Sequence, residues 1–175
     1  SDAVNAEIAS PQAIATIVDN DAVAATASNP ASLSVRDVVV DEKAGTATFF
    51  VLLDRPVPNA FSVDYSAANG TAVSGSDFVL PAGSLTFAPN ETLKSVTISV
   101  VDDNDAEPDE SFNLRLGALG GGAANLVQIS DGVATALIGR SDGPISAKPG
   151  DTVQSVMAGR SDGFVDFVVQ LGAPS

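Results

Sequence analysis

The sequence predicts an all-β protein, an antiparallel β-sandwich of about seven strands, and three observations carry this prediction. Apolar and polar residues alternate along most of the chain, which is the period of a half-buried strand. Turn-forming residues separate these stretches at short intervals, and no segment has the spacing of an amphipathic helix. With 175 residues, 45% of them hydrophobic, the chain can bury a core between two sheets.

Four segments show the alternation most clearly. The stretch TATFFVLL at 46–53 places on one face Ala47, Phe49, Val51 and Leu53. The stretch FSVDYSA at 61–67 does the same with Phe61, Val63 and Tyr65, and SLTFA at 84–88 with Leu85 and Phe87. A fourth, KSVTISVV at 94–101, aligns Val96, Ile98 and Val100. Turns are expected at Asn69-Gly70, Pro81-Ala82-Gly83 and Pro89-Asn90, and the glycine-rich stretch 117–125 is expected to form a hairpin loop.

The charge balance restricts the possible partners. The chain has 22 acidic and only 8 basic residues, a formal net charge of -14. Nucleic acids and anionic membrane surfaces are bound through Lys and Arg, so neither is an expected partner. The longest strictly apolar run, Phe49 to Leu53, is far too short to span a membrane, so no direct membrane insertion is expected. Cations are the natural partners of such a chain.

The residue types that are absent exclude several kinds of site. The sequence contains no His, no Cys and no Trp. Nucleophilic sites that need His or Cys, thiolate or imidazole zinc sites and disulfides are therefore excluded. A metal in this protein must be held by oxygen ligands, and a cluster of carboxylates on flexible loops favours calcium, Ca²⁺. We expect no enzymatic activity from these residues.

One short segment concentrates the acidic residues. Between positions 102 and 110, in VDDNDAEPDES, six carboxylates follow a predicted strand and precede an aromatic residue. Such a cluster between strands is often only a solvated turn. It becomes a candidate cation site if loops at the same end of the sandwich bring further carboxylates to it, because a cation offsets the repulsion among them.

The central part of the chain resembles the Calx-beta domain family. The resemblance covers about residues 33–138, including VVVDEKAGTATFFVLL, the stretch NGTAVSGSDF, the stretch FAPNET, and Asp102-Asp103 followed by EPDE. It implies an immunoglobulin-like β-sandwich of the kind found in sodium-calcium exchangers and in many secreted or cell-surface proteins, often in tandem. It also implies calcium ions bound between loops at one end of the sandwich.

The resemblance implies a set of metal ligands, which is carried over residue by residue. The set consists of Glu42, Asp77, Asp102, Asp103, Glu107 and Glu110. One departure from the family pattern stands against calcium: family members that bind calcium usually end with a run of aspartates, whereas this stretch reads Gly139-Arg140-Ser141-Asp142. Two interpretations follow, a calcium site that uses Glu42, Asp103 and Glu107, or an acidic loop that is solvated or bridged by Arg140.

Self-similarity predicts a tandem organisation. Residues 13–21 resemble 133–141, a shift of 120, and residues 35–53 resemble 153–171, a shift of 118. We therefore expect the last strand of a preceding unit at 1–21, a linker at 22–31, a complete Calx-beta-like domain at 32–141, and the first two strands of a following unit at 145–175.

The leading functional hypothesis is a non-catalytic structural and adhesive module of an extracellular or cell-surface tandem-repeat protein, stiffened by calcium. Its partners would be neighbouring repeats, or other copies of itself, bound by strand pairing. A first alternative is a subunit of an extracellular filament or sheet that is completed by strand exchange between copies. A second alternative is an accessory domain of a secreted hydrolase.

Overall fold

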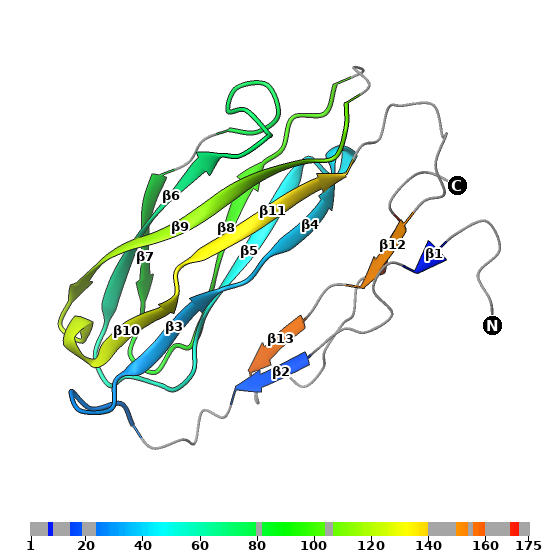
Figure 1. Ribbon diagram of the computed structural model, residues 1–175. Coiled ribbons are helices and arrows are strands. Elements are labelled where there is room, and N and C mark those ends of the chain that lie inside the picture. The colour runs from blue at the N-terminus through cyan, green and yellow to red at the C-terminus, as the bar shows by residue number, and fades with distance from the viewer. Residues whose placement is uncertain are drawn as a thin grey trace.

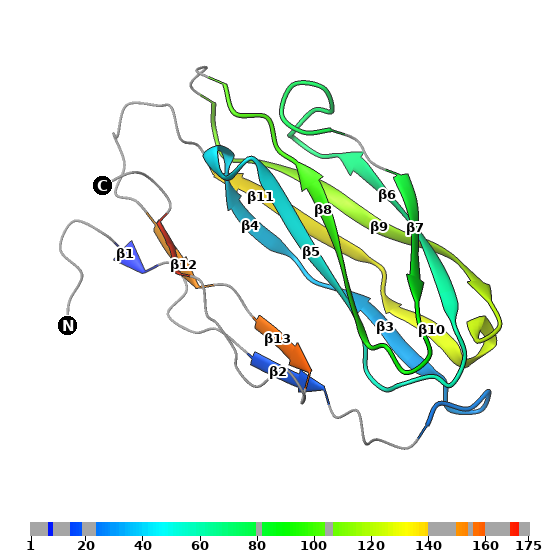
Figure 2. The same cartoon turned by 180° about the vertical axis from the view of Figure 1, so that it is seen from behind.

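The computed structural model describes residues 24–79, 82–103 and 107–139, together with the backbone of five short strands on either side of them. Its central part is a β-sandwich, as the sequence predicts, and Figure 1 and Figure 2 show its two sheets from opposite sides. One sheet has the strand order β10-β3-β5-β8 and the other the order β4-β11-β9-β6-β7. The strands of the two sheets are β3 (Ala31–Val35), β4 (Val38–Asp41), β5 (Thr46–Leu53), β6 (Phe61–Asn69), β7 (Ala82–Phe87), β8 (Leu93–Ser99), β9 (Glu110–Gly121), β10 (Val127–Asp131) and β11 (Val133–Gly139).

The five remaining strands lie outside this sandwich in the sequence. They are β1 (Glu7–Ile8), β2 (Ala15–Val18), β12 (Gly150–Val153), β13 (Val156–Gly159) and β14 (Val169–Leu171). They form a sheet of order β1-β12-β14 and a pair β13-β2. Within the described part of the chain, no helix has both the length and the apolar character needed to cross a membrane.

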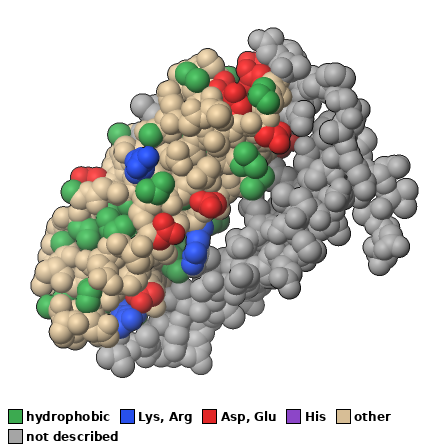
Figure 3. Space-filling model, viewed as in Figure 1, with side chains coloured by type: hydrophobic (Ala, Val, Ile, Leu, Met, Phe, Trp, Pro, Cys, Tyr) green, Lys and Arg blue, Asp and Glu red, His purple; other side chains and the backbone are tan. Residues whose placement is uncertain are grey.

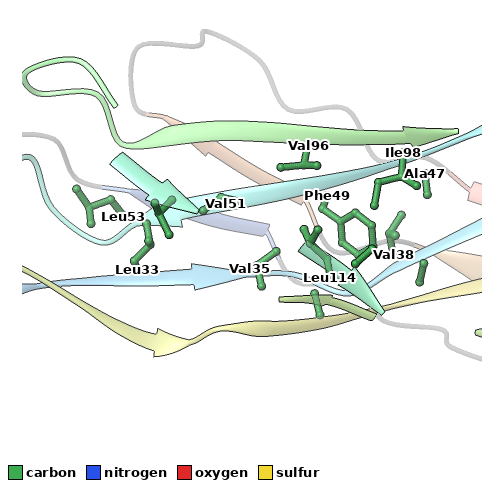
Figure 4. Close-up of a cluster of buried hydrophobic side chains, with 14 of the residues drawn as sticks. Leu33, Val35, Val38, Ala47, Phe49, Val51, Leu53, Val96, Ile98 and Leu114 are labelled. Atoms are coloured by element: carbon green, nitrogen blue, oxygen red, sulfur yellow. The ribbon is translucent and has the colours of Figure 1, made fainter. Parts of the chain in front are cut away.

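The predicted alternation of buried side chains is confirmed. On β5, the residues Ala47, Phe49, Val51 and Leu53 have no exposed surface. Beside them on the same sheet lie Leu33 and Val35 of β3 and Val96 and Ile98 of β8, and Leu114 of the other sheet belongs to the same core (Figure 4). Each of the larger side chains in this group removes apolar surface from water, which stabilises the fold by roughly 1.5 to 3 kcal/mol for a fully buried Val, Leu, Ile or Phe. Period-two alternation thus places the core between the sheets.

The first strand divides between the two sheets, which the sequence does not predict. Residues 31–35 pair in parallel with β10, and residues 38–41 pair in parallel with β11. The crossing falls at Arg36-Asp37, where the Asp37 carboxylate accepts a hydrogen bond of 2.7 Å from the Thr135 amide. The sandwich is therefore a mixed one: these two parallel pairs accompany the antiparallel pairs that join the other strands.

The glycine-rich stretch 117–125 is only partly the loop that the sequence suggests. Strand β9 continues to Gly121, and a short 3-10 turn at Ala124–Leu126 follows it. A Cβ at Gly120 would lie 2.9 Å from the Ser62 hydroxyl, and one at Gly121 would lie 3.1 Å from the Phe61 Cα. Gly121 also has a φ of 88°, a conformation that favours glycine, so glycine is needed at this position at the end of β9.

The loop after β6 packs closely against the start of β9 at Gly70. A Cβ at Gly70 would collide with the Ser111 carbonyl oxygen, which is a backbone atom that cannot swing away. The same carbonyl accepts a hydrogen bond of 2.9 Å from the Ala72 amide, and the Thr71 hydroxyl accepts one of 2.8 Å from the Ser111 amide. Residues 70–72 are thereby fixed against Ser111.

Gly70→Ala is expected to lower the free energy of unfolding by about 1 to 3 kcal/mol, because the added methyl group must push two backbone segments apart. Gly117→Ala is the matched control, because its Cβ would make only ordinary contacts of 3.6 Å with Asp64. Urea unfolding of the two variants checks the prediction. Equal stability in both variants would contradict the tight tether between Gly70 and Ser111.

Candidate metal centre

Strands β4 and β11 end, and β9 begins, at one end of the sandwich (Figure 1). Acidic side chains gather at this end, as Figure 3 shows. Four of them line one small pocket that is open to solvent, and we call this group the acidic pocket: Glu42, Asp77, Glu107 and Glu110. The remaining lining residues are Val101, Pro108, Ile138 and Gly139. The pocket thus combines hard oxygen ligands with a partly apolar wall.

Glu42 is held by a capped turn between β4 and β5. The Asp41 carboxylate accepts a hydrogen bond of 2.9 Å from the Lys43 amide, and so caps the 3-10 turn Glu42–Ala44. Gly45 ends the turn with a φ of 68°, a conformation that favours glycine. Glu42 is only 7% exposed, which is unusual for an acidic side chain.

Asp77 is held by the loop between β6 and β7. Its carboxylate accepts a hydrogen bond of 2.6 Å from the Val73 amide, and its carbonyl oxygen accepts one of 2.9 Å from the Val101 amide. The next residue, Phe78, is fully buried and stacks on Phe112 with ring centroids 4.1 Å apart. The stacking of Phe78 on Phe112 therefore fixes the backbone next to Asp77 and, with it, the position of the Asp77 carboxylate.

Glu107 and Glu110 come from the acidic segment at 102–110. Glu110 is the first residue of β9 and is paired with Ile138 of β11, while Glu107 lies three positions earlier. Oxygen atoms of Asp77, Glu107 and Glu110 all lie within 4.8 Å of one another. Three carboxylates at such distances repel one another unless a proton or a cation lies between them.

The electrostatics of Glu110 reflect this crowding. Its Oε2 atom is buried and has no hydrogen-bond partner. Burial is the largest cause that raises the pKa of Glu110 from 4.5 to about 7, followed by a hydrogen bond to Asp77 and by the charges of Asp77, Glu107 and Glu42. Without a cation, a proton held on Glu110 near neutral pH relieves part of the repulsion.

A pH dependence follows from this raised pKa. Because Glu110 binds its proton more tightly in the folded state, its stabilising contribution is complete below pH 4.5 and is lost as the pH rises through about 7. In the presence of a chelator, the difference in unfolding free energy between the native chain and Glu110→Gln should therefore change in this window. Urea unfolding across that pH range checks it, and a constant difference would contradict the shared proton.

The six residues predicted from the sequence divide into two groups. Four of them, Glu42, Asp77, Glu107 and Glu110, meet in the acidic pocket. Asp102 and Asp103 are exposed and are not among the carboxylates within 4.8 Å of one another. Arg140, the proposed bridging cation, lies outside the described residues. Sequence reasoning missed Asp41, although an aspartate directly before a short turn is a recognised capping signal.

The sequence and the fold of this chain are similar to those of known proteins. The sequence profile of the Calx-beta domain matches residues 26–142. The chain belongs to the Calx-beta domain family. The crystal structure of the apo-form Calx CBD1 domain has a similar fold, with 29% sequence identity and a TM-score of 0.56; the match covers 62% of this chain and 95% of that one. The crystal structure of the calcium binding domain CBD12 of CALX1.1 is also similar, with 29% identity and a TM-score of 0.54. That match covers 59% of this chain and 43% of the other.

Sequence relatives are much longer than this chain. The alignment with adhesion G-protein coupled receptor V1 of Danio rerio shows 32% identity over 139 positions and covers 72% of this chain and 2% of the receptor. Sodium/calcium exchanger 2 of Rattus norvegicus is 43% identical over 58 residues, which are 33% of this chain and 6% of the exchanger. The chain therefore corresponds to a small module within each of these large proteins.

Proposed function

We propose that this chain is a non-catalytic, calcium-binding structural module, and that the acidic pocket is its metal site. The observation that carries the proposal is the convergence of Asp77, Glu107 and Glu110 within 4.8 Å, beside the buried Glu42. Calcium takes six to eight oxygen ligands in flexible geometry, and carboxylates from several loops meet that need. One of the similar structures is that of a calcium binding domain, which supports the same ion.

A bound calcium ion would link several loops of the sandwich to one another. Glu42 follows β4, Asp77 lies in the loop after β6, and Glu107 precedes β9, so one ion would join three separate connections of the sandwich. The capped turn that carries Glu42 and the hydrogen bond that holds the Asp77 carboxylate reduce the conformational entropy that must be lost on binding. A site of this kind stiffens one end of the module without a large change of shape.

The proposed setting is an extracellular or cell-surface array of repeats. The similarity to an adhesion receptor and to a sodium/calcium exchanger supports a membrane-associated or surface context. The CBD12 structure, whose similar part makes up 43% of its chain, supports neighbouring Calx-beta repeats as partners. In such an array, calcium at the loop end would set the stiffness of the junction between repeats.

Thermal unfolding in excess calcium and in excess chelator tests the metal site. A ligand at about 100 times its dissociation constant stabilises the folded state by about 2.7 kcal/mol, which for a domain of this size raises the Tm on the order of 5 to 10 °C. Asp77→Asn should abolish most of this difference. Identical melting of the native chain in calcium and in chelator would refute the calcium site.

Asp64→Asn is the matched control for this experiment. Asp64 is exposed on β6 and lies five residues before the end of that strand at Asn69, which is about 16 Å along an extended chain. The substitution removes the same charge as Asp77→Asn, so it measures the effect of net charge alone. It should leave the calcium-dependent rise in Tm intact.

A further inference from the structure

The strands that flank the complete sandwich pair with one another across nearly the whole length of the chain. Strand β1 pairs in parallel with β12, and β2 pairs in parallel with β13. Strand β14 adds to β12 in antiparallel orientation. Both flanking segments lie outside residues 26–142, the part that the Calx-beta profile matches. The family match therefore does not account for the pairing of these flanking strands.

The pair β2-β13 repeats the pair β11-β4 residue by residue. Val156 pairs with Ala15 as Val38 pairs with Ala136. Position 156 lies 118 residues after 38, and position 15 lies 121 residues before 136. The same two offsets relate each of the remaining register pairs of β2-β13 to a pair of β11-β4. The last pair, Gly159 with Val18, corresponds to Asp41 with Gly139. Both pairs are parallel, which is the less common orientation in sheets of this type.

The sheet β1-β12-β14 repeats the order β10-β3-β5 with the same two offsets. Asp151 is paired with Ile8 on one side and with Leu171 on the other. In the complete sandwich, Leu33 is paired with Ile129 and with Leu53. A slip of one residue would exchange the two faces of a strand. The agreement of both sheets in strand order, orientation and register therefore points to one common architecture.

We propose that β1 and β2 are closing strands, and β12, β13 and β14 opening strands, of a second Calx-beta unit that is split around the complete one, and that these strands pair with each other within one chain. The closing strands align with an offset of 121, one residue more than sequence similarity alone suggests. Among the described flanking strands, none corresponds to β6 through β9. Strand β14 corresponds to β5, which pairs with β8 in the complete sandwich. Strand β2 corresponds to β11, which pairs with β9 there.

Disulfide trapping tests the register, because the native sequence contains no cysteine. Thr16 and Met157 are register partners, and their counterparts in the complete sandwich are Leu137 and Val39. Neighbouring strands lie about 4.8 Å apart, within the range that a disulfide spans. The double variant T16C/M157C should form an intramolecular disulfide under mild oxidation, to an extent similar to the positive control V39C/L137C. The variant T16C/A158C, one position out of register, should form much less.

Each outcome of this experiment decides the proposal. An intramolecular cross-link in T16C/M157C that exceeds the one in T16C/A158C supports it. Equal cross-linking of the two variants, or none, would overturn the register. Cross-links that form only between chains, detected by mixing the single variants T16C and M157C, would overturn the assignment of the partner to the same chain. None of these readouts depends on calcium, so they remain separate from the test of the metal site.

Hydrogen exchange of the native chain gives a second test that needs no cysteine. Amides of residues 15–18 and 156–159 should share one level of protection, because they belong to one parallel pair. Met157→Pro removes a backbone donor from β13, and it should reduce protection of residues 15–18 at least about 10-fold while residues 111–116 of β9 keep theirs. Unchanged protection of residues 15–18 in this variant would contradict the pairing.

Discussion

Replacing Phe112 with alanine is expected to lower the free energy of unfolding by about 3 to 5 kcal/mol, the range for removing a buried aromatic ring. Phe112 has no exposed surface. Its ring stacks on Phe78 and meets Phe49 edge-on at 5.9 Å between centroids. The substitution therefore removes contacts with both sheets and with the loop that carries Asp77. Such a loss is a large part of the stability of a domain of this size.

The effect of Phe112→Ala should extend to the metal site. Phe78 is adjacent to Asp77, and Phe112 lies two positions after Glu110, so the stacked pair fixes two carboxylates of the acidic pocket at once. Phe87→Ala is a suitable control, because Phe87 is equally buried but stacks on Phe61 instead. Both variants should lose stability in urea unfolding, and only Phe112→Ala should also weaken calcium binding. Equal calcium affinity in the two variants would contradict the coupling.

Removing charge from the acidic pocket should have the largest effect on calcium affinity. The double variant Glu107→Gln/Glu110→Gln keeps the size of both side chains but removes two of the three carboxylates that lie within 4.8 Å of one another. Changes to residues that only support metal ligands cost about 10- to 100-fold in affinity, so the loss of two proposed ligands should cost more than about 100-fold. Isothermal titration of calcium into the native chain and the variant measures it.

The same double variant should be no less stable than the native chain in chelator. The substitutions remove repulsion among Glu42, Asp77 and the two altered residues, and an amide at position 110 needs no proton to remain neutral. A loss of calcium binding together with preserved stability in chelator separates ligand removal from misfolding. A variant that binds calcium as tightly as the native chain would show that the ion is held elsewhere.

The sequence was sufficient to predict the sandwich because its core follows a simple period. The alternation in residues 46–53 identified the four side chains of β5 that are fully buried, and the inward residues of β8 followed the same rule. The division of the first strand between two sheets was not predicted. Alternation alone cannot reveal it, because it indicates which side chains of a strand are buried and not whether the partner strand is β10 or β11.

Loop residues were harder to predict than strand residues. The family resemblance pointed to six carboxylates, and the structure gathers four of them. Membership of an acidic loop does not determine which side chains turn inward: Glu110 begins a strand and is paired with Ile138, whereas Asp102 and Asp103 follow the end of β8 and are exposed. Phe78 was missed as a core residue because it lies in a loop, where no periodic pattern identifies an inward position.

The most direct test of the proposed metal site is calcium titration of the native chain by calorimetry near neutral pH, repeated in buffers of different ionisation enthalpy. Metal binding to carboxylates requires their deprotonation, and the pKa of Glu110 is raised to about 7. We expect saturable binding with a heat that varies between buffers, which reports proton release from the acidic pocket. Absence of saturable binding would contradict the proposed metal site, and binding without proton release would contradict the role assigned to Glu110.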